Sequence, residues 1–249
     1  MKKLLSTLLF SFIISFSLFA NVENTFQQAN ELYSNGEYTQ AIELYDSLIN
    51  SNVSSANIYY NIGNSYFKLD DIPNAILYFE KAKKIEPNNL DIIYNIELAN
   101  TRIADKIEQV PHFFLKTIYL TTLNSLTEKQ WTTVNISLFI IFLIFIVLFY
   151  TRSTNRRLWL SFSIAFIILT FTSGIIGFQS YKQKTTHNTA IIFTPTIDIK
   201  SAPDTKSNTI FILHQGTKIT LLEKTAQWQK VRIASGSEGW LKTNNIIEI

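Results

Sequence analysis

The sequence contains no cysteine and a single methionine, Met1, among its 249 residues. The lack of cysteine excludes disulfide bonds, thiolate metal sites, a lipoprotein anchor and a cysteine nucleophile, while it leaves the redox compartment undecided. With one methionine and no thiol, the chain is a poor candidate for sensing oxidation through its own side chains.

Recognisable catalytic motifs are also missing: the sequence has no HExxH, GxSxG, phosphate-binding loop or paired-cysteine pattern. The three histidines, His112, His187 and His214, fall in separate segments, and His214 lies at a predicted turn where a structural role is expected. The adjacent Asp70 and Asp71 are interpreted as helix caps rather than metal ligands. We therefore predict no enzymatic activity, no cofactor and no metal.

The net charge is +3, but acidic and basic residues are unevenly distributed along the chain. Residues 21–110 hold 13 acidic and 6 basic side chains, whereas residues 182–249 hold 9 basic and 5 acidic ones. A nucleic-acid-binding protein would concentrate more basic residues on one soluble module, so no nucleic-acid partner is expected.

The N-terminal stretch, residues 1–20, has Lys2 and Lys3 before an apolar run and ends at Ala20. This pattern predicts a signal peptide. Leu18 is larger than the ideal residue three positions before a cleavage site, so an uncleaved N-terminal anchor is the alternative. In both cases the chain from residue 21 onward is exported.

Residues 21–107 have helical periodicity and an internal repeat of 34 residues, which is typical of tetratricopeptide (TPR) repeats. In this register small or bulky residues recur together: Ala29 with Gly63, Ala41 with Ala75, Tyr45 with Phe79, and Leu48 with Ala82. Small residues are expected where the two helices of a repeat cross closely. Asn35-Gly36 predicts a turn, because glycine tolerates a left-handed backbone.

A further helix is predicted over residues 90–107, in the place of a capping helix, with Asp91, Glu97, Arg102, Asp105 and Lys106 facing water. Two repeats make a short array. We therefore expect a partner or the membrane to complete it.

The first helix of each repeat lines the concave groove of a TPR array. Asparagine amides there can both donate to and accept from an extended peptide, and tyrosines give contact area at low entropic cost. The same asparagines are also frequent in TPR repeats for structural reasons. The predicted groove residues are Phe26, Asn30, Tyr33, Tyr60, Asn61, Asn64, Lys68, Tyr94, Asn95 and Arg102.

Two runs without a charged residue, 132–150 and 158–178, predict transmembrane helices, because about 20 apolar residues span the hydrocarbon. The loop between them, 151–157, contains three arginines, which predicts a cytoplasmic location. Neither span has the ionisable residues that a transporter would need. The preceding linker, 108–131, is interpreted either as an amphipathic segment at the membrane surface or as a connecting helix packed on the repeats.

Residues 187–249 change to period-two patterning with turn signals, which predicts a small closed barrel. The predicted strands are 190–193, 197–200, 209–214, 217–223, 228–233, 238–241 and 245–248. Trp228, Lys230 and Arg232 share one face of a predicted strand, and with Trp240 they form a candidate ligand face.

The C-terminal segment resembles a bacterial SH3-type domain. The resemblance rests on Ile197-Asp198-Ile199-Lys200 followed by Pro203, on Leu213-His214-Gln215-Gly216, on Trp228-Gln229-Lys230-Val231 and, most specifically, on Gly239-Trp240-Leu241. Gln229 stands where an aromatic residue is often found.

The full order of segments resembles the BatE-type aerotolerance proteins of bacterial envelopes, with similar stretches at 59–88, 95–100 and 194–218. This resemblance implies a role beside membrane proteins with von Willebrand A domains and a cytoplasmic MoxR-type ATPase.

The fold class predicted is multidomain: an all-α TPR helical repeat, a two-helix transmembrane hairpin and an all-β SH3-like barrel. The predicted function is a non-enzymatic scaffold of the bacterial inner membrane that binds envelope proteins, with both soluble modules periplasmic and close enough to touch. The alternative is an envelope sensor whose SH3-type domain binds peptidoglycan or wall peptides.

Overall fold

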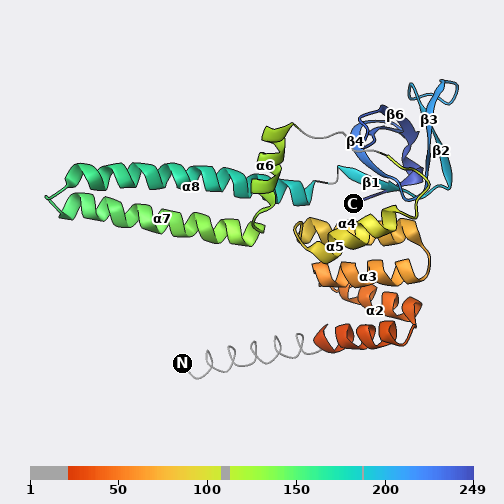
Figure 1. Ribbon diagram of the computed structural model, residues 1–249, viewed down its shortest axis with the longest axis horizontal. Helices are drawn as coiled ribbons and strands as arrows, with labels where there is room; N and C mark the ends of the chain where they lie inside the picture. Colours follow the sequence, from red (N-terminus) through yellow and green to blue (C-terminus); the bar gives the residue numbers. More distant parts are fainter. Residues whose placement is uncertain (1–21, 108–112, 187) are drawn as a thin grey trace, which may run out of the picture. The chain divides into compact units, whose positions relative to one another are not determined.

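The computed structural model describes residues 22–107, 113–186 and 188–249. The predicted signal peptide, His112 and His187 lie outside the described residues. The chain forms two compact units (Figure 1): residues 22–107 join residues 188–249 in one, and residues 113–186 form the other. The helical-repeat region, the two apolar helices and the C-terminal antiparallel β domain confirm the predicted fold class.

The repeat region is a series of antiparallel helices. After a first helix at residues 22–34, it contains α2 (Tyr38–Asn50), α3 (Ala56–Lys68), α4 (Ile72–Ile85) and α5 (Leu90–Asn100). Ser55 caps α3 by accepting from the amide of Ile58 at 3.2 Å, and Asn89 caps α5. Gly36 has a φ of +84°, as its predicted turn requires.

The small residues of the repeat occupy the helix crossings. A Cβ atom on Gly63 would lie 2.5 Å from the Phe79 ring of α4, so only glycine permits this approach. Ala41 and Ala75 are fully buried, and Tyr45 fills the equivalent space in the first repeat. The sequence-based explanation for the small positions is therefore confirmed.

Two local predictions need correction. Asp71 caps α4 by accepting from the amide of Asn74, but Asp70 has a φ of +62° and caps nothing; it pairs with Arg102 instead. The helix predicted to run to residue 107 ends at Asn100, because the chain then turns toward the β domain.

The β domain consists of seven short strands, each within two residues of its predicted bounds. They are β1 (Thr189–Ile192), β2 (Thr196–Lys200), β3 (Thr209–His214), β4 (Lys218–Thr225), β5 (Trp228–Arg232), β6 (Glu238–Lys242) and, after a 3₁₀ turn at Thr243–Asn245, β7 (Ile246–Glu248). The strands form one sheet in the order β3-β2-β6-β5-β4-β1-β7 around a core that includes Ile199, Val231 and Leu241. Because β3 and β7 are edge strands, the barrel is open between them rather than closed as predicted.

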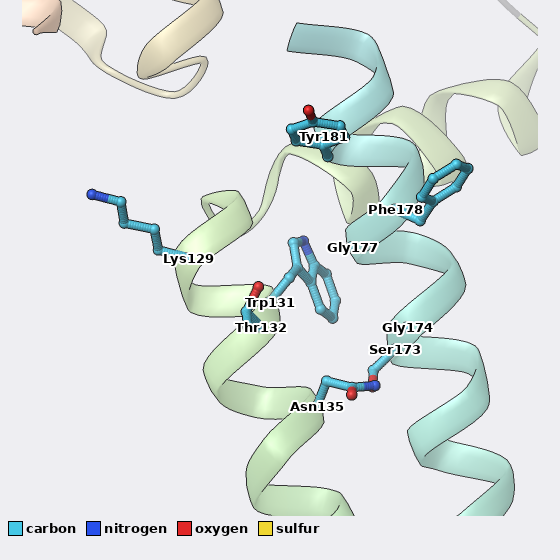
Figure 2. A pocket seen from close by; sticks show the side chains of 9 residues that line it. All are labelled: Lys129, Trp131, Thr132, Asn135, Ser173, Gly174, Gly177, Phe178 and Tyr181. Carbon is cyan, nitrogen blue, oxygen red and sulfur yellow. The ribbon is translucent and has the colours of Figure 1, made fainter. Parts of the chain in front are cut away.

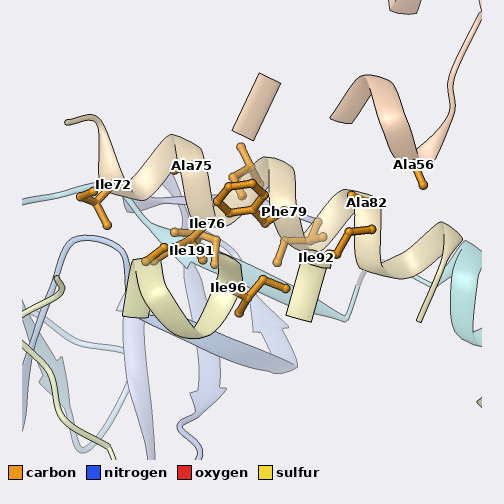
Figure 3. Packing of buried hydrophobic residues seen from close by; sticks show 12 residues of the cluster. Ala56, Ile72, Ala75, Ile76, Phe79, Ala82, Ile92, Ile96 and Ile191 are labelled. Atoms are coloured by element: carbon orange, nitrogen blue, oxygen red, sulfur yellow. The ribbon is translucent and has the colours of Figure 1, made fainter. Parts of the chain in front are cut away.

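The β domain completes the helical array. Ile191 of β1 and Ile249 belong to the same buried cluster as Ile76 of α4 and Ile92 and Ile96 of α5 (Figure 3). The exposed end of the short array is thus covered by the chain itself, and not by a partner or the membrane as expected. The prediction that the two soluble modules touch is confirmed.

The second unit contains α6 (Phe114–Asn124), α7 (Glu128–Thr151) and α8 (Arg156–Thr185). Thr127 and Gln130 form a capping box that starts α7. α7 and α8 pack along each other as a hairpin. Their stretches 129–151 and 156–182 are long and apolar enough to cross a membrane.

Candidate functional site

Four of the predicted groove asparagines form two hydrogen-bonded pairs between successive helices. Nδ2 of Asn61 donates to Oδ1 of Asn30 at 3.0 Å, and Nδ2 of Asn95 donates to Oδ1 of Asn64 at 2.9 Å. Both pairs join residues 31 positions apart. This amide ladder, defined by these four residues, links the first helix, α3 and α5 and holds each side chain in place.

Tyrosine hydroxyls extend the ladder. The Tyr45 hydroxyl donates to Oδ1 of Asn30 at 2.6 Å, and Nδ2 of Asn95 also donates to the hydroxyl of Tyr60 at 2.9 Å. Burial raises the pKa of Tyr45 to about 12, although a hydrogen bond with Asn61 opposes the shift, so this hydroxyl keeps its proton at neutral pH. The ladder is therefore neutral, with hydrogen-bonding groups that carry no net charge.

The other predicted groove residues differ in exposure. Tyr94 is 63% exposed on α5, and Lys68 is exposed at the end of α3. Tyr33 is half-buried against Tyr38 with ring centroids 5.3 Å apart, and burial raises its pKa. Phe26 packs against Tyr45 rather than standing free. Tyr94 and Lys68 are thus the side chains best placed to meet a partner.

Arg102 is held in place by neighbouring side chains. Its guanidinium lies 3.1 Å from the carboxylate of Asp70 and over the ring of Phe67. Both members of the ion pair are largely exposed, so the pair adds little to stability. The ion pair does offset the positive charge of Arg102, which was predicted to line this end of the groove.

A second cluster, which the sequence analysis did not identify, lies across α2, α3 and α4. The rings of Tyr66 and Tyr78 stack at 5.5 Å, and Nζ of Lys81 lies 4.8 Å from the Tyr78 centroid. Burial raises the pKa of Asp46, against the opposing effects of Lys81 and a hydrogen bond from Tyr78. These residues cross-brace the two repeats. Tyr59 also packs against Tyr78. Its seven-residue spacing from Tyr66, which puts both rings on one face of α3, is the sequence signal that could have indicated this cluster.

The outward face of the β domain contains the predicted ligand residues in two adjacent strands. Lys230 of β5 lies opposite Trp240 of β6, and Arg232 lies opposite Glu238. Glu238 binds both cations, at 2.9 Å from Lys230 and through a hydrogen bond from Nε of Arg232 at 2.8 Å. Hydrogen bonds from Lys230 and Arg232 lower the pKa of Glu238. The strand pattern did not point to this carboxylate, which offsets one of the two positive charges.

A third polar cluster joins the repeats to the β domain through Asp105. Its carboxylate accepts from the backbone amide of His214 at 2.7 Å and from the hydroxyl of Thr217 at 2.6 Å, and it lies 2.7 Å from Nδ1 of the His214 ring. The side chain of Asp105 is only 12% exposed, so the prediction that it faces water is wrong. His214 is thus one of the residues through which the β domain contacts the repeats.

Two lysines add to the same junction. Lys218 lies 2.6 Å from the carboxylate of buried Glu80, and Lys84 donates to the carbonyl of Ile249 at 2.5 Å. Burial would raise the pKa of Asp105, but hydrogen bonds from Thr217 and His214 outweigh it and hold the value below normal. The acidic repeats and the basic β domain therefore meet through specific ion pairs.

A hollow lies between the two helices of the apolar hairpin, near the start of α7 (Figure 2). Trp131 lies between the helices there, and Asn135 donates to the carbonyl of Thr170 at 2.7 Å and to Ser173 at 2.9 Å. A Cβ on Gly177 would lie 3.2 Å from Trp131. These contacts fix the packing of α7 on α8.

Comparisons with known proteins agree with this geometry. A tetratricopeptide repeat model matches residues 56–89, a TPR repeat model matches residues 29–70, and a bacterial SH3 domain model matches residues 195–246. No curated protein matches the chain. The chain therefore contains TPR repeats and a bacterial SH3 domain, separated in sequence by two long apolar helices.

Proposed function

We propose that this chain is a non-enzymatic, membrane-anchored scaffold of the bacterial envelope. In this proposal the ladder face, which consists of Asn30, Tyr33, Tyr60, Asn61, Asn64, Lys68, Tyr94, Asn95 and Arg102, binds a protein partner. The partner belongs to the membrane proteins with von Willebrand A domains that the resemblance to aerotolerance proteins implies.

The amide ladder is the observation that carries this proposal. Bonds within the ladder use Nδ2 of Asn61 and Asn95. Among the described residues, no hydrogen bond to the side-chain carbonyl oxygens of these two amides is found, so these oxygens can accept from a partner. Tyr94 is exposed beside them. A fixed row of neutral acceptors with an exposed aromatic ring suits an extended peptide, whose backbone amides need acceptors.

In-cell photo-crosslinking tests the partner. A photoreactive residue at Lys68 or Tyr94 is expected to capture one or a few reproducible membrane proteins, and Asn95→Ala in the same chain is expected to reduce the yield. The matched control is Glu43, which is exposed on α2 away from the ladder. Equal products from Glu43, or no reproducible protein from Lys68 and Tyr94, would overturn the proposal.

The proposed topology places both soluble modules in the periplasm and residues 151–157 in the cytoplasm. It is supported by Arg152, Arg156 and Arg157 between the two apolar helices. Because the chain has no native cysteine, single cysteines report sidedness cleanly. A cysteine at Thr154 is expected to react only after the inner membrane is made permeable, whereas one at Asn208 should react without that step. The opposite pattern would contradict the topology.

The alternative function, binding of peptidoglycan or wall peptides by the SH3-type domain, is favoured by the two tryptophans of its outward face. Trp228 and Trp240 are half-buried, so their exposed edges remain open to a ligand. Detergent-solubilised full-length protein should be retained on isolated sacculi, and Trp240→Ala should reduce retention. Equal retention of the variant and the parent would remove this alternative.

A further inference from the structure

The short helix α6 exposes a large apolar surface beside the hairpin. Exposure reaches 60% at Phe114, 56% at Leu115, 58% at Ile118 and 46% at Tyr119, whereas Leu123 is buried. An isolated exposed leucine needs no explanation, but several large apolar side chains together on eleven residues mark an interaction surface.

Most of the large apolar residues of α6 lie on one side of the helix. At 100° per residue, Phe114, Leu115, Ile118 and Tyr119 fall within one half of the circumference. Lys116, Thr117, Thr121 and Asn124 fall in the other half, which also contains Leu120, while Thr122 is the one polar residue within the apolar half. The helix is therefore amphipathic, with its apolar half left open.

The position of α6 within its unit indicates what covers this surface. It packs against α8 and lies crosswise to the hairpin, at the end away from the loop between α7 and α8 (Figure 1). Only residues 125–127 separate it from α7. A helix crosswise to two membrane spans at their end lies in the plane of the membrane surface.

Charge favours lipid over a protein partner. At the α6 end of the hairpin, residues 110–130 and 180–187 contain four lysines against a single acidic residue, Glu128. The side chains at the level where α7 begins include Trp131, and Tyr181 of α8 lines the same hollow, which is the composition expected at a membrane interface. Anionic lipid phosphates complement this charge.

We propose that α6 is an interfacial anchor that lies in the plane of the bilayer. Its apolar half, Phe114, Leu115, Ile118 and Tyr119, inserts among the acyl chains to a depth of about 5–10 Å. Lys116 on the polar half meets lipid phosphates. The inference rests on the proposed insertion of the α7–α8 hairpin into the membrane, and it adds a second, surface-bound element to the anchor.

Site-directed labelling of the full chain in vesicles of phosphatidylethanolamine and phosphatidylglycerol tests this inference. Since there is no native cysteine, an environment-sensitive fluorophore can be attached at Leu115→Cys or Tyr119→Cys, and at Thr117→Cys or Thr121→Cys on the opposite half. The first pair should show blue-shifted emission and quenching by lipids with a nitroxide near the headgroup. The second pair should be quenched by aqueous iodide.

Two further positions separate this proposal from the proposed membrane insertion. Ile140, in the middle of α7, should be quenched by nitroxides deep in the acyl chains, and Leu90, 78% exposed on α5, should be quenched by iodide alone. If nitroxide lipids quench the label at Ile140 while only iodide quenches the labels at all four α6 positions, the interfacial anchor is overturned and the membrane insertion of the hairpin is supported. If Ile140 reports water, the membrane insertion itself fails.

A third result would also overturn the anchor. Leu115 and Tyr119 shielded from both iodide and lipid nitroxides would show that protein, not lipid, covers α6. Vesicles of phosphatidylcholine alone test the electrostatic contribution. Quenching of Leu115 and Tyr119 by lipid nitroxides should persist in them, and Lys116→Gln should weaken this quenching only when phosphatidylglycerol is present.

Discussion

The amide ladder of the repeats and the outward face of the β domain use their polar side chains differently. In the ladder, neutral amides bond to one another and keep further acceptor capacity. On the β domain, one carboxylate, Glu238, binds the two cations Lys230 and Arg232. From residue types alone the second face would be called strongly basic, but Glu238 offsets one of its two positive charges before a ligand arrives.

The difference shows that hydrogen-bond partners, more than residue types, decide what a surface offers. Asparagine has two donor hydrogens and an acceptor oxygen, so one internal bond leaves capacity for a ligand. A cation held by a nearby carboxylate must lose that partner before it can pair elsewhere. The ladder is accordingly the stronger candidate for binding, and the following variants test this comparison.

The largest loss of stability is expected from a variant that disrupts the packing of α3, which carries Asn61 and Asn64 of the ladder, against α4. Gly63→Val would drive its side chain into the Phe79 ring, because even a Cβ atom would lie 2.5 Å away. We expect a loss of about 3 kcal/mol in unfolding free energy, at the upper end for overpacking. Chemical denaturation measures it. Asn57→Val, exposed on the same helix, should cost less than about 0.5 kcal/mol.

The next largest loss of stability is expected at the junction between the repeats and the β domain, which form one compact unit. Asp105→Ala would leave the amide of His214 and the hydroxyl of Thr217 without their acceptor, which should cost about 2 kcal/mol. Thermal unfolding should change from one transition toward two as the β domain separates. The exposed Glu97→Ala on α5 is the control, and an equal change there would contradict this reading.

The same carboxylate gives the junction a pH dependence. The pKa of Asp105 is held below its usual value in the folded state, so the stability it contributes is present above the unfolded value of about 3.9 and is lost as pH falls through the folded value. Unfolding free energies measured from pH 6 to pH 3 should therefore fall more steeply for the parent than for Asp105→Asn. Parallel curves would show that Asp105 does not titrate with folding.

A smaller effect is expected within the ladder. Asn95→Ala removes the bonds to Asn64 and Tyr60 and should cost about 1 kcal/mol, because these groups are half-buried and water can replace part of the loss. Crosslinking of the partner should decline more than stability does. Asn100→Ala, exposed at the end of α5, should leave both unchanged.

The smallest change in stability is expected on the β domain. Glu238→Gln frees Lys230 and Arg232 from a solvent-exposed carboxylate, so the melting temperature should hardly move. Binding to an anionic polymer such as heparin should rise and should weaken with salt. Unchanged polymer binding would mean that Glu238 does not limit the basic character of this face.

Much of the fold followed from patterns that are local in the sequence. The 34-residue period predicted that Gly63 lies at a close helix crossing, where the structure has the Phe79 ring, and the alternation of apolar residues predicted all seven strands within two residues. The mutual bonding of the ladder asparagines could not be read in this way, because a period gives the face of a residue and not its rotamer. Glu238 was missed for the same reason: its partners lie on the neighbouring strand.

The sequence by itself determined the repeats, the strands and the two long apolar helices, since each depends on the spacing of apolar, small and turn-forming residues along one segment. Tertiary structure alone decided how the short array is completed. Asp105 meets His214 across 109 residues of sequence, and Ile191 and Ile249 join the core of α4 and α5. Such contacts depend on the shapes and partners of two folded modules, and no local period encodes them.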